Sequence, residues 1–322
     1  MNSRSLIQDY ICEMKKGSSN SSQYVVASRL NSLVKYEKQI GRAFALMTDE
    51  EICNFLIDDL KVDSSVDLSN YRDTYYSFYQ WIVDRGFYQG VNLNIFDVSE
   101  MLSFDALMRF MTKNIVIVQD SDLQKLAGKF EYNKFYVETV LRCFFEGFFK
   151  TTELSALVKK DIQGRQIHIG GRNIVGSEQL INGLKKVYRT KIWYLKDGKP
   201  REMTSSTPEH IFKYVTLNKS DSKVQAAKNG RESTRKHLSK NILALPELDS
   251  CKVDAQTLYL SGILHYMAQR MTKERIYQIT IADRSSAGVD AVAKAMGLKH
   301  TGARLKYMLK PYVLKFISTA EN

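Results

Sequence analysis

Residues 295–312 read AMGLKHTGARLKYMLKPY and place Tyr307 at the start of a basic helical stretch, after a Gly-Leu pair. A tyrosine hydroxyl can attack phosphorus, but a phenol of pKa about 10 is a poor nucleophile without help. Arginine can hold phosphate oxygens through two parallel hydrogen bonds, and histidine or lysine can transfer protons. The neighbours that Tyr307 has in space therefore decide whether it is a nucleophile or an ordinary packing tyrosine.

Two other stretches contain groups of this kind. Residues 150–162 read KTTELSALVKKDI, where Lys150 stands three positions before a Glu-Leu pair, followed by Leu157 and Asp161. Residues 272–307 read TKERIYQITIADRSSAGVDAVAKAMGLKHTGARLKY and bring Arg275 into the same segment as Tyr307. These stretches have helical periodicity, whereas DIQGRQIHIGGRNIVGS between them alternates with turn glycines and predicts a three-stranded antiparallel meander.

In order and spacing, these motifs resemble those of the tyrosine recombinase (phage integrase) family, over about residues 20–312. That family has an arginine three residues before the Glu-Leu pair, a His-x-x-Arg motif, a Leu-Gly-His motif and a nucleophilic tyrosine. At these positions the present sequence has, in order, Lys150, Thr272, Arg275, Leu298 and Tyr307. The resemblance also aligns Glu153 with the family's Glu-Leu pair, keeps Gly297 before the lost histidine, and leaves Arg172 as the cation of the β-hairpin, where the family has a lysine.

The resemblance implies a transesterification of DNA in which the tyrosine attacks a phosphate, and this sequence lacks much of the machinery. Lys150 keeps a charge but cannot form the two parallel bonds of an arginine. Thr272 and Leu298 cannot transfer protons usefully, and losing a general acid or base typically costs about 10²–10⁴ in rate. His300 could replace the lost histidine only if the turn shifted by two residues. We therefore expect no catalytic residue, and regard the five positions as vestigial.

DNA binding is the property that the resemblance leaves intact. It implies contacts to the phosphate backbone near the vestigial positions, from Lys150, Arg172, Arg275, Lys299, Arg304 and Tyr307. Lys299 and Arg304 could also simply solvate a helix. Within the first domain, the weaker candidates are Lys35, Lys38, Arg42, Arg72, Tyr75 and Tyr76.

The expected fold is mainly α with a small antiparallel β-sheet, arranged as a two-domain clamp like that of the tyrosine recombinases. Residues 1–96 are predicted to form a helical core-binding (SAM-like) domain, with N-caps in GSSNSS, a Thr48–Glu51 capping box and a linker at 90–100. Residues 97–322 are predicted to form the catalytic-like α+β domain. In it, 178–193 and 207–217 are expected to be helical, and a polar, basic insertion is expected near 220–241.

The charge distribution agrees with a polyanion partner. The 322 residues carry a formal charge of +12, yet residues 1–100 hold 10 basic and 14 acidic side chains. Residues 181–240 hold 15 basic and 5 acidic side chains. Such a one-sided distribution is typical of proteins that bind nucleic acid.

Other classes of site find no support in the sequence. The four cysteines are scattered and are expected to be free thiols. No signal peptide, apolar run of membrane-spanning length, metal-binding motif or nucleotide-binding loop is present, so we expect a cytoplasmic protein without membrane contact, metal or cofactor.

The leading hypothesis is a sequence-specific, non-catalytic DNA-binding protein, because the sequence is similar to the degenerate recombinase-like repressors that keep SPbeta-like prophages in lysogeny. This step rests on analogy between families. The partners would be double-stranded DNA and possibly a further copy of the chain or a phage-encoded regulator. An active integrase that uses Tyr307 and an accessory DNA-binding protein of a recombination complex are the alternatives.

Overall fold

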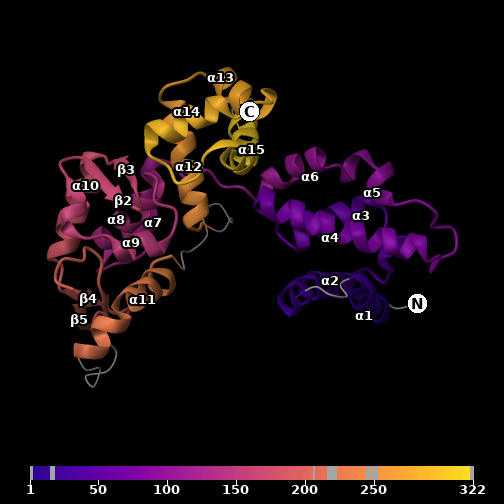
Figure 1. Ribbon diagram of the computed structural model, residues 1–322, viewed down its shortest axis with the longest axis horizontal. Coiled ribbons are helices and arrows are strands. Elements are labelled where there is room, and N and C mark those ends of the chain that lie inside the picture. Colours follow the sequence, from indigo (N-terminus) through magenta and orange to yellow (C-terminus); the bar gives the residue numbers. More distant parts are fainter. Residues whose placement is uncertain are drawn as a thin grey trace. The chain divides into compact units, whose positions relative to one another are not determined.

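The computed structural model of the protein describes residues 3–14, 19–205, 207–215, 223–243, 248 and 253–319. The chain divides into two compact units, Met1–Ile115 and Val116–Asn322, which we call unit 1 and unit 2. Helices dominate the ribbon, and the sheets found among these residues are small and antiparallel (Figure 1). The predicted class is thus confirmed, whereas the clamp arrangement stays a prediction.

Unit 1 is helical throughout its described part. Its elements are α1 (Ser3–Met14), α2 (Asn20–Ile40), η1 (Phe44–Leu46), α3 (Asp49–Asn54), the π-helical turn η2 (Phe55–Asp59), α4 (Ser65–Asp84), α5 (Ile95–Val98), η3 (Glu100–Leu102), α6 (Phe104–Met111) and η4 (Thr112–Asn114).

The predicted helix starts of unit 1 are confirmed. The Ser19 hydroxyl accepts a hydrogen bond from the N–H of Ser22 and caps α2. Thr48 and Glu51 form the reciprocal capping box of α3, with bonds of 3.2 and 2.9 Å. These caps satisfy N–H groups that the first turn of a helix leaves without partners, so they fix where α2 and α3 begin.

The core of unit 1 is aromatic. Tyr75 and Phe78 on α4 are fully buried, and the ring of Tyr10 on α1 meets Phe78 edge-on at 5.2 Å between centroids. Phe44 lies under the same helix, parallel to Phe78 at 6.2 Å. The aromatic positions YYSFYQW of the sequence therefore serve packing, as helical spacing predicts.

Residues 97–115 pack on unit 1, which differs from the predicted boundary after residue 96 and from a linker at 90–100. The side-chain amide of Asn114 donates to the carbonyls of Ile57 and Val62, at 2.7 and 3.1 Å. The guanidinium Nε of Arg72 donates to the carbonyl of Leu102 at 2.9 Å. Because these bonds join positions far apart in sequence, the segment belongs to the helical unit, and composition alone does not reveal such bonds.

Unit 2 combines helices with small sheets. Its elements are α7 (Asp120–Gly128), α8 (Lys134–Phe145), α9 (Thr151–Ala156), η5 (Lys159–Asp161), β1 (Ile162–Gln163), β2 (Gln166–Ile169), β3 (Arg172–Val175), α10 (Glu178–Arg189), β4 (Ile192–Tyr194), β5 (Pro200–Thr204), β6 (Tyr214–Val215), α11 (Lys223–Asn241), α12 (Ala255–Ala268), α13 (Lys273–Tyr277), the π-helical turn η6 (Gln278–Ala282), α14 (Ala287–Met296) and α15 (Gly302–Ser318).

The strands form two antiparallel meanders, in the orders β1-β2-β3 and β4-β5-β6. The first confirms the predicted meander, and its register pairs Ile167 with Ile174 and Ile169 with Arg172. The second was not predicted. Its strand β4 pairs Trp193 with Arg201 on β5, in a stretch that the sequence assigned to the end of a helix.

One prediction in this second region is wrong. Residues 207–217, expected to be helical, form a bridge between His210 and Val158 and then strand β6. The N–H of Ile211 donates to the carbonyl of Leu157, and both side chains are buried, so pairing with a distant segment overrides the local pattern. The stretch predicted as a basic insertion forms helix α11 in its described part, and Leu238 of this helix and Ile242 just after it are fully buried in the core.

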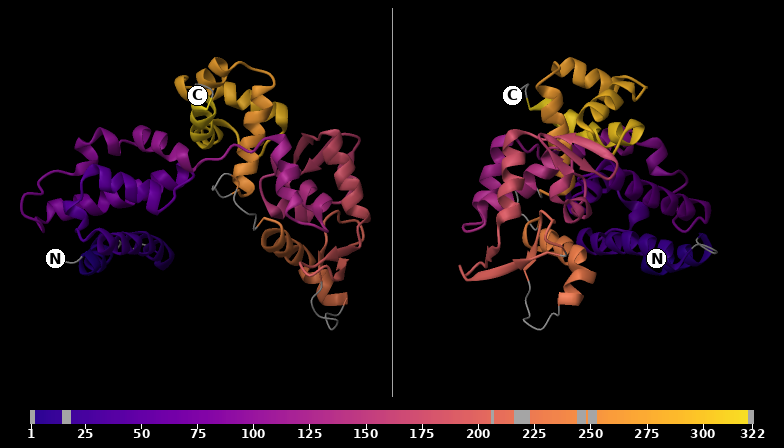
Figure 2. Two further views of the ribbon diagram at one scale, coloured as in Figure 1. Left: turned by 180° about the vertical axis from the view of Figure 1, so that it is seen from behind. Right: turned by 60° about the vertical axis from the view of Figure 1, so that its left-hand side comes forward.

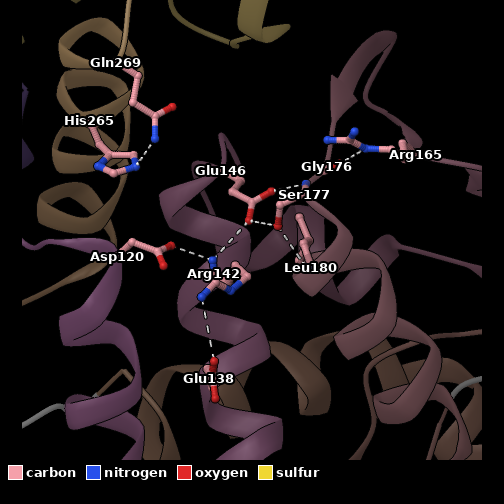
Figure 3. A network of polar contacts seen from close by, with 10 residues as sticks. All are labelled: Asp120, Glu138, Arg142, Glu146, Arg165, Gly176, Ser177, Leu180, His265 and Gln269. Carbon is pink, nitrogen blue, oxygen red and sulfur yellow. Dashed lines mark hydrogen bonds and ion pairs between the residues drawn. The ribbon is translucent and has the colours of Figure 1, made fainter.

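Helix α8 runs through the middle of unit 2 and carries a buried charge network. Figure 3 shows the guanidinium of Arg142 between the carboxylates of Asp120, Glu138 and Glu146, with nitrogen–oxygen distances of 2.7, 3.8 and 3.6 Å. Glu146 in turn accepts bonds of 2.6 Å from the N–H and the hydroxyl of Ser177, the N-cap of α10. The network thereby joins α7, α8 and α10.

The C-terminal helices join this core through α12. A Cβ on Gly262 would lie 1.7 Å from the carbonyl oxygen of Phe145, so only glycine allows α12 to approach α8 this closely. Helices α13, α14 and α15 pack around one another beside α12, and they end the chain on one side of unit 2 (Figure 2). This arrangement sets the position of the turn between α14 and α15, which contains Leu298.

Candidate nucleic-acid interface

The guanidinium of Arg172 holds together three segments that the sequence separates widely. Its Nη1 donates to the carbonyls of Gly147 and Gly297 at 3.0 and 2.8 Å, and its Nη2 lies 2.9 Å from Oε1 of Glu153. Both side chains of the ion pair are 11% exposed. Arg172, predicted to contact DNA, therefore binds protein groups instead, and it connects β3 to α9 and to the turn after α14.

Glu153 also caps helix α9. Its Oε2 accepts hydrogen bonds from the N–H groups of Phe149 and Lys150, at 2.7 and 3.4 Å. One carboxylate thus neutralises Arg172 and satisfies the first turn of the helix. As a result, the charge of Glu153 is already balanced inside the protein.

The Gly297–Leu298 turn sits against strand β3. Gly297 has φ 64°, and a Cβ there would lie 1.7 Å from the carbonyl oxygen of Asn173, so this position requires glycine. Leu298 is buried at 6% exposed, with its side chain against Gly147 and close to Ile174. A hydrocarbon therefore fills the place where the resemblance expects a histidine.

His300 follows in the same turn and packs inward. Its ring meets Phe149 edge-on at 4.2 Å between centroids, and within the described chain its buried Nε2 has no hydrogen-bond partner. Burial lowers the pKa of His300, and the charges of Arg304, Lys299 and Lys150 lower it further, while Glu153 opposes them. The imidazole is consequently held in its neutral form beside these cations.

Tyr259 on α12 completes the buried part of this cluster. Its ring lies 5.1 Å from that of Phe149 and 6.2 Å from that of His300. Burial raises the pKa of Tyr259 to about 12, although the backbone N–H of His300 and the charge of Arg172 favour the ionised form. Tyr259 therefore packs directly behind the basic turn.

The cations at the surface of the turn are Lys150, Lys299 and Arg304, and all three are exposed. They come from α9, from the turn itself and from α15. The structure thus brings together three of the predicted DNA contacts around His300.

Thr272, Arg275 and Tyr307 lie on neighbouring elements, α13 and α15, which pack against each other. The Thr272 hydroxyl accepts the N–H of Arg275 at 3.3 Å and is the N-cap of α13. Arg275 is exposed, so it needs no buried anionic partner. Tyr307 is half-buried, beside the buried Lys306, whose ammonium donates to the carbonyls of Asp283 and Ser285.

The candidates of unit 1 fall into two groups. Lys35 and Lys38 are exposed on α2. Arg42 binds both oxygens of Glu51, at 3.0 and 2.8 Å, and the Arg72 guanidinium is occupied by Leu102 as described above. The tyrosines serve the fold, because the Tyr75 hydroxyl donates to the Arg29 carbonyl and that of Tyr76 to Asp97.

The solvent side of α2 is free of acidic groups, a feature that sequence reasoning missed. In this helix the single acidic residue is Glu37, which is buried at 9% exposed and accepts the N–H of Phe44 at 2.7 Å. Ser28, Asn31 and Gln39 are exposed on the helix along with Lys35 and Lys38. The helical pattern of the sequence, read with Glu37 placed inside, could have revealed this face.

The described residues offer neither a metal site nor a membrane-spanning helix. In the described part of the chain, no three His, Cys, Asp or Glu side chains are grouped so that they could hold a metal ion. The helices described there are all too short or too polar to cross a membrane. Cys12, Cys53 and Cys143 are free thiols, and Cys251 lies outside the described residues.

Comparisons with known proteins give weak likenesses. No protein-family model matches the sequence, and no curated protein matches it. Among solved structures, the chain is similar to a lambda integrase dimer (residues 75–356) bound to a COC′ core site, at 11% identity and TM-score 0.40, over 92% of this chain and 97% of the other.

Two further structures are similar to the same degree. XerA recombinase matches at 11% identity and TM-score 0.36, over 99% and 98% of the two chains. The Tn1549 transposon integrase in complex with a circular intermediate DNA matches at 11% identity and TM-score 0.41, over 98% and 99%. These TM-scores are too low to indicate what the chain does.

Proposed function

We propose that the chain binds double-stranded DNA through a basic face of unit 2 formed by Lys150, Lys299 and Arg304, with Arg275 beside it on α13. The observation that carries this proposal is a charge imbalance. Two carboxylates lie near these cations: Glu153 is already paired with Arg172 at 2.9 Å, and Asp290 accepts hydrogen bonds from the Ser286 hydroxyl and the N–H of Gly302. The exposed cations around them therefore keep their charge for an outside anion, and a DNA phosphate backbone offers a row of such charges.

The fold contributes rigidity to this face. The Arg172 guanidinium ties the Gly297 carbonyl to Glu153, and Gly297 lets the turn lie directly on β3. Lys299 and Lys150 consequently start from fixed backbone positions. Pre-positioned cations lose less conformational freedom on binding than mobile ones. Lys35 and Lys38 on the acid-free side of α2 would add contacts from unit 1.

We further propose that the chain binds DNA without cutting it. Leu298 replaces a proton-transferring side chain with a hydrocarbon, and the Thr272 hydroxyl is used as a helix cap. Lys150 holds a phosphate only as a point charge. A tyrosine phenol, whose pKa is ordinarily about 10, is a weak nucleophile unless a general base assists it.

A sequence-specific repressor that maintains a prophage in lysogeny is the biological role that fits such a protein. Support for this role comes from the similarity of the motifs to those of degenerate, recombinase-like repressors. The physical part of the proposal is the DNA-binding face; the regulatory part is an inference from analogy.

Selection of binding sites from a random duplex library tests the function. We expect enrichment of one site and binding that weakens steeply with salt. Lys150→Ala combined with Arg275→Ala should lower the affinity about tenfold or more at moderate salt. The matched control is Lys61→Ala with Arg109→Ala, which removes two exposed cations elsewhere that form no ion pair in the described chain. Tight binding that ignores DNA sequence would favour the accessory-protein alternative instead.

An active integrase is the second candidate, and one observation favours it. The His300 ring lies among these cations, and the pKa of His300 is lowered, first by its burial. A neutral imidazole is therefore present beside them. On a nicked suicide substrate, an integrase would form a covalent 3′-phosphotyrosyl adduct. We expect no adduct, and equal binding by Tyr307→Phe. An adduct that vanishes in Tyr307→Phe and in His300→Gln would establish the enzyme.

A further inference from the structure

The most basic section of the chain lies away from the proposed DNA-binding face. Residues 181–240 hold 15 basic and 5 acidic side chains. Strands β4 and β5 and helix α11 from this section form one end of unit 2, and α13, α14 and α15 form the opposite end (Figures 1 and 2). The charge there is thus not explained by the face around Lys299.

Two exposed tyrosines stand at the β4–β5 end. Tyr132 and Tyr194 are 47% and 37% exposed, and their rings lie 5.7 Å apart between centroids. Ile192, two residues before Tyr194 on the same side of the strand, is 46% exposed. These exposed aromatic rings, each with a polar hydroxyl tip, offer area to which a partner can bind.

The backbone of β4 at Tyr194 cannot hydrogen-bond to a further strand. The side-chain amide of Asn133 donates to the carbonyl of Tyr194 at 2.7 Å and accepts its N–H at 3.1 Å. Asn133 is 8% exposed, so the side chain that covers this edge of β4 belongs to the core. A partner therefore cannot extend the sheet at Tyr194 and has to recognise side chains.

The β4–β5 hairpin that carries Tyr194 has more cations than acids, although Glu131 beside Tyr132 is an exposed acid. Lys191, Lys196 and Arg201 are exposed and form no ion pair with any carboxylate in the described chain. Lys199 is bound to Asp197 at 3.0 Å, and Glu202 is the exposed acid on β5. In the strand register, Glu202 lies opposite Ile192 and shares the face of Tyr194, whereas Arg201 lies opposite Trp193 and projects from the other face. The hairpin as a whole keeps an excess of positive charge over its two faces, and the tyrosine hydroxyls beside it can donate to phosphate oxygens.

We propose that this β4–β5 surface docks a second segment of double-stranded DNA, so that one chain holds two duplexes. Its residues are Tyr132, Lys191, Ile192, Tyr194, Lys196 and Arg201. The proposal goes beyond the function given above and rests on it in one respect, namely that the opposite end of unit 2 binds the first duplex. Because the two surfaces lie at opposite ends of one compact unit, each takes its own segment.

Native mass spectrometry with a short random-sequence duplex tests this proposal. The wild-type chain is expected to form complexes with one and with two duplexes. Lys191→Ala, Lys196→Ala and Arg201→Ala in combination should raise the duplex concentration needed for the second binding step about tenfold or more, and should leave the first unchanged. Lysine-to-arginine exchange at 191 and 196 should preserve both steps.

The matched control removes three exposed cations elsewhere that form no ion pair in the described chain, by Lys61→Ala, Arg109→Ala and Lys160→Ala, and should leave both steps unchanged. The proposal is overturned if the β4–β5 variant binds two duplexes as well as the wild-type chain does. It is also overturned if the wild-type chain binds only one duplex, or if it pairs with a second copy of itself through this surface. If the wild-type chain binds no duplex at all, the proposed function itself fails, so the two failures are distinguishable.

Discussion

Arg172 and Glu153 form an ion pair of 2.9 Å in which each side chain is only 11% exposed. The remaining Arg172 contacts go to the carbonyls of Gly147 and Gly297, so the guanidinium connects a strand, a helix start and a turn. Such a residue supports the DNA-binding face from beneath. A phosphate-binding arginine would instead keep its donors directed to solvent.

Breaking this ion pair should mainly lower the stability of the protein, and it should change the charge of the surface little. Glu153→Gln leaves a nearly buried guanidinium without its counter-charge and should lower the free energy of unfolding by about 3 kcal/mol. Urea denaturation followed by circular dichroism measures this loss. Lys125→Ala breaks the exposed pair with Asp122, where the lysine is 70% exposed, and should cost less than about 1 kcal/mol. Equal losses in the two variants would contradict the role given to Arg172.

Gly297→Ala should be among the most damaging small substitutions in unit 2. The added Cβ meets the Asn173 carbonyl at 1.7 Å, and φ is 64°. We expect a loss of about 2–5 kcal/mol, from overpacking together with left-handed backbone strain. Gly86→Ala is the control, because Gly86 has φ 62° and open space around it, so it should lose only about 1 kcal/mol. If Gly86→Ala were as damaging, the close approach of the turn to β3 would have no special importance.

The sequence predicts much of this fold because its signals are local. Thr48 and Glu51 form the capping box that their spacing indicates, and IHIGGRNI forms the expected hairpin. The β4-β5-β6 sheet was missed because its stability comes from partners far away in sequence. Ile211, for example, hydrogen-bonds to Leu157, and local helical periodicity cannot report such a contact.

The candidate site was predictable to a similar extent. Lys150, Lys299 and Arg304 are exposed where the motif order indicated. Sequence reasoning gave Arg172 the same task, since nothing in the sequence shows that Glu153 folds back onto it. Burial and pairing of a charge depend on tertiary contacts, so only the structure separates a supporting arginine from a surface one.

His237 should make stability depend on pH in acid. Its ring packs on Trp193 at 4.7 Å, and burial lowers its pKa from 6.5 to about 4. The unfolded imidazole therefore takes up a proton first as the pH falls. Stability that is present above pH 6.5 should be lost as the pH falls toward 4, up to about 3 kcal/mol. Urea denaturation at a series of pH values measures the slope, and His237→Phe should flatten it. An unchanged slope would show that other groups cause the acid sensitivity.

Salt titrations should separate surface cations from supporting ones. For the wild-type chain, the logarithm of the binding constant should fall linearly with that of the salt concentration. Lys299→Ala and Arg304→Ala should each reduce this slope by about 1 without changing thermal stability, because each removes one phosphate contact. Fluorescence anisotropy on the selected site provides the measurement. Arg172→Lys should instead lower thermal stability. The assignment fails if Lys299→Ala leaves the slope at its wild-type value.

The same titration can identify the contacts of unit 1. Lys35 and Lys38 are exposed on the acid-free side of α2, and their joint replacement by alanine should reduce the slope by about 2. Arg42→Ala should have a smaller effect, because the guanidinium is held by both oxygens of Glu51. Arg72→Ala removes a bond to the Leu102 carbonyl, so it should lower stability and leave the slope unchanged. A slope that responds to Arg72 and ignores the lysines would move the DNA-binding surface of unit 1 from α2 to α4.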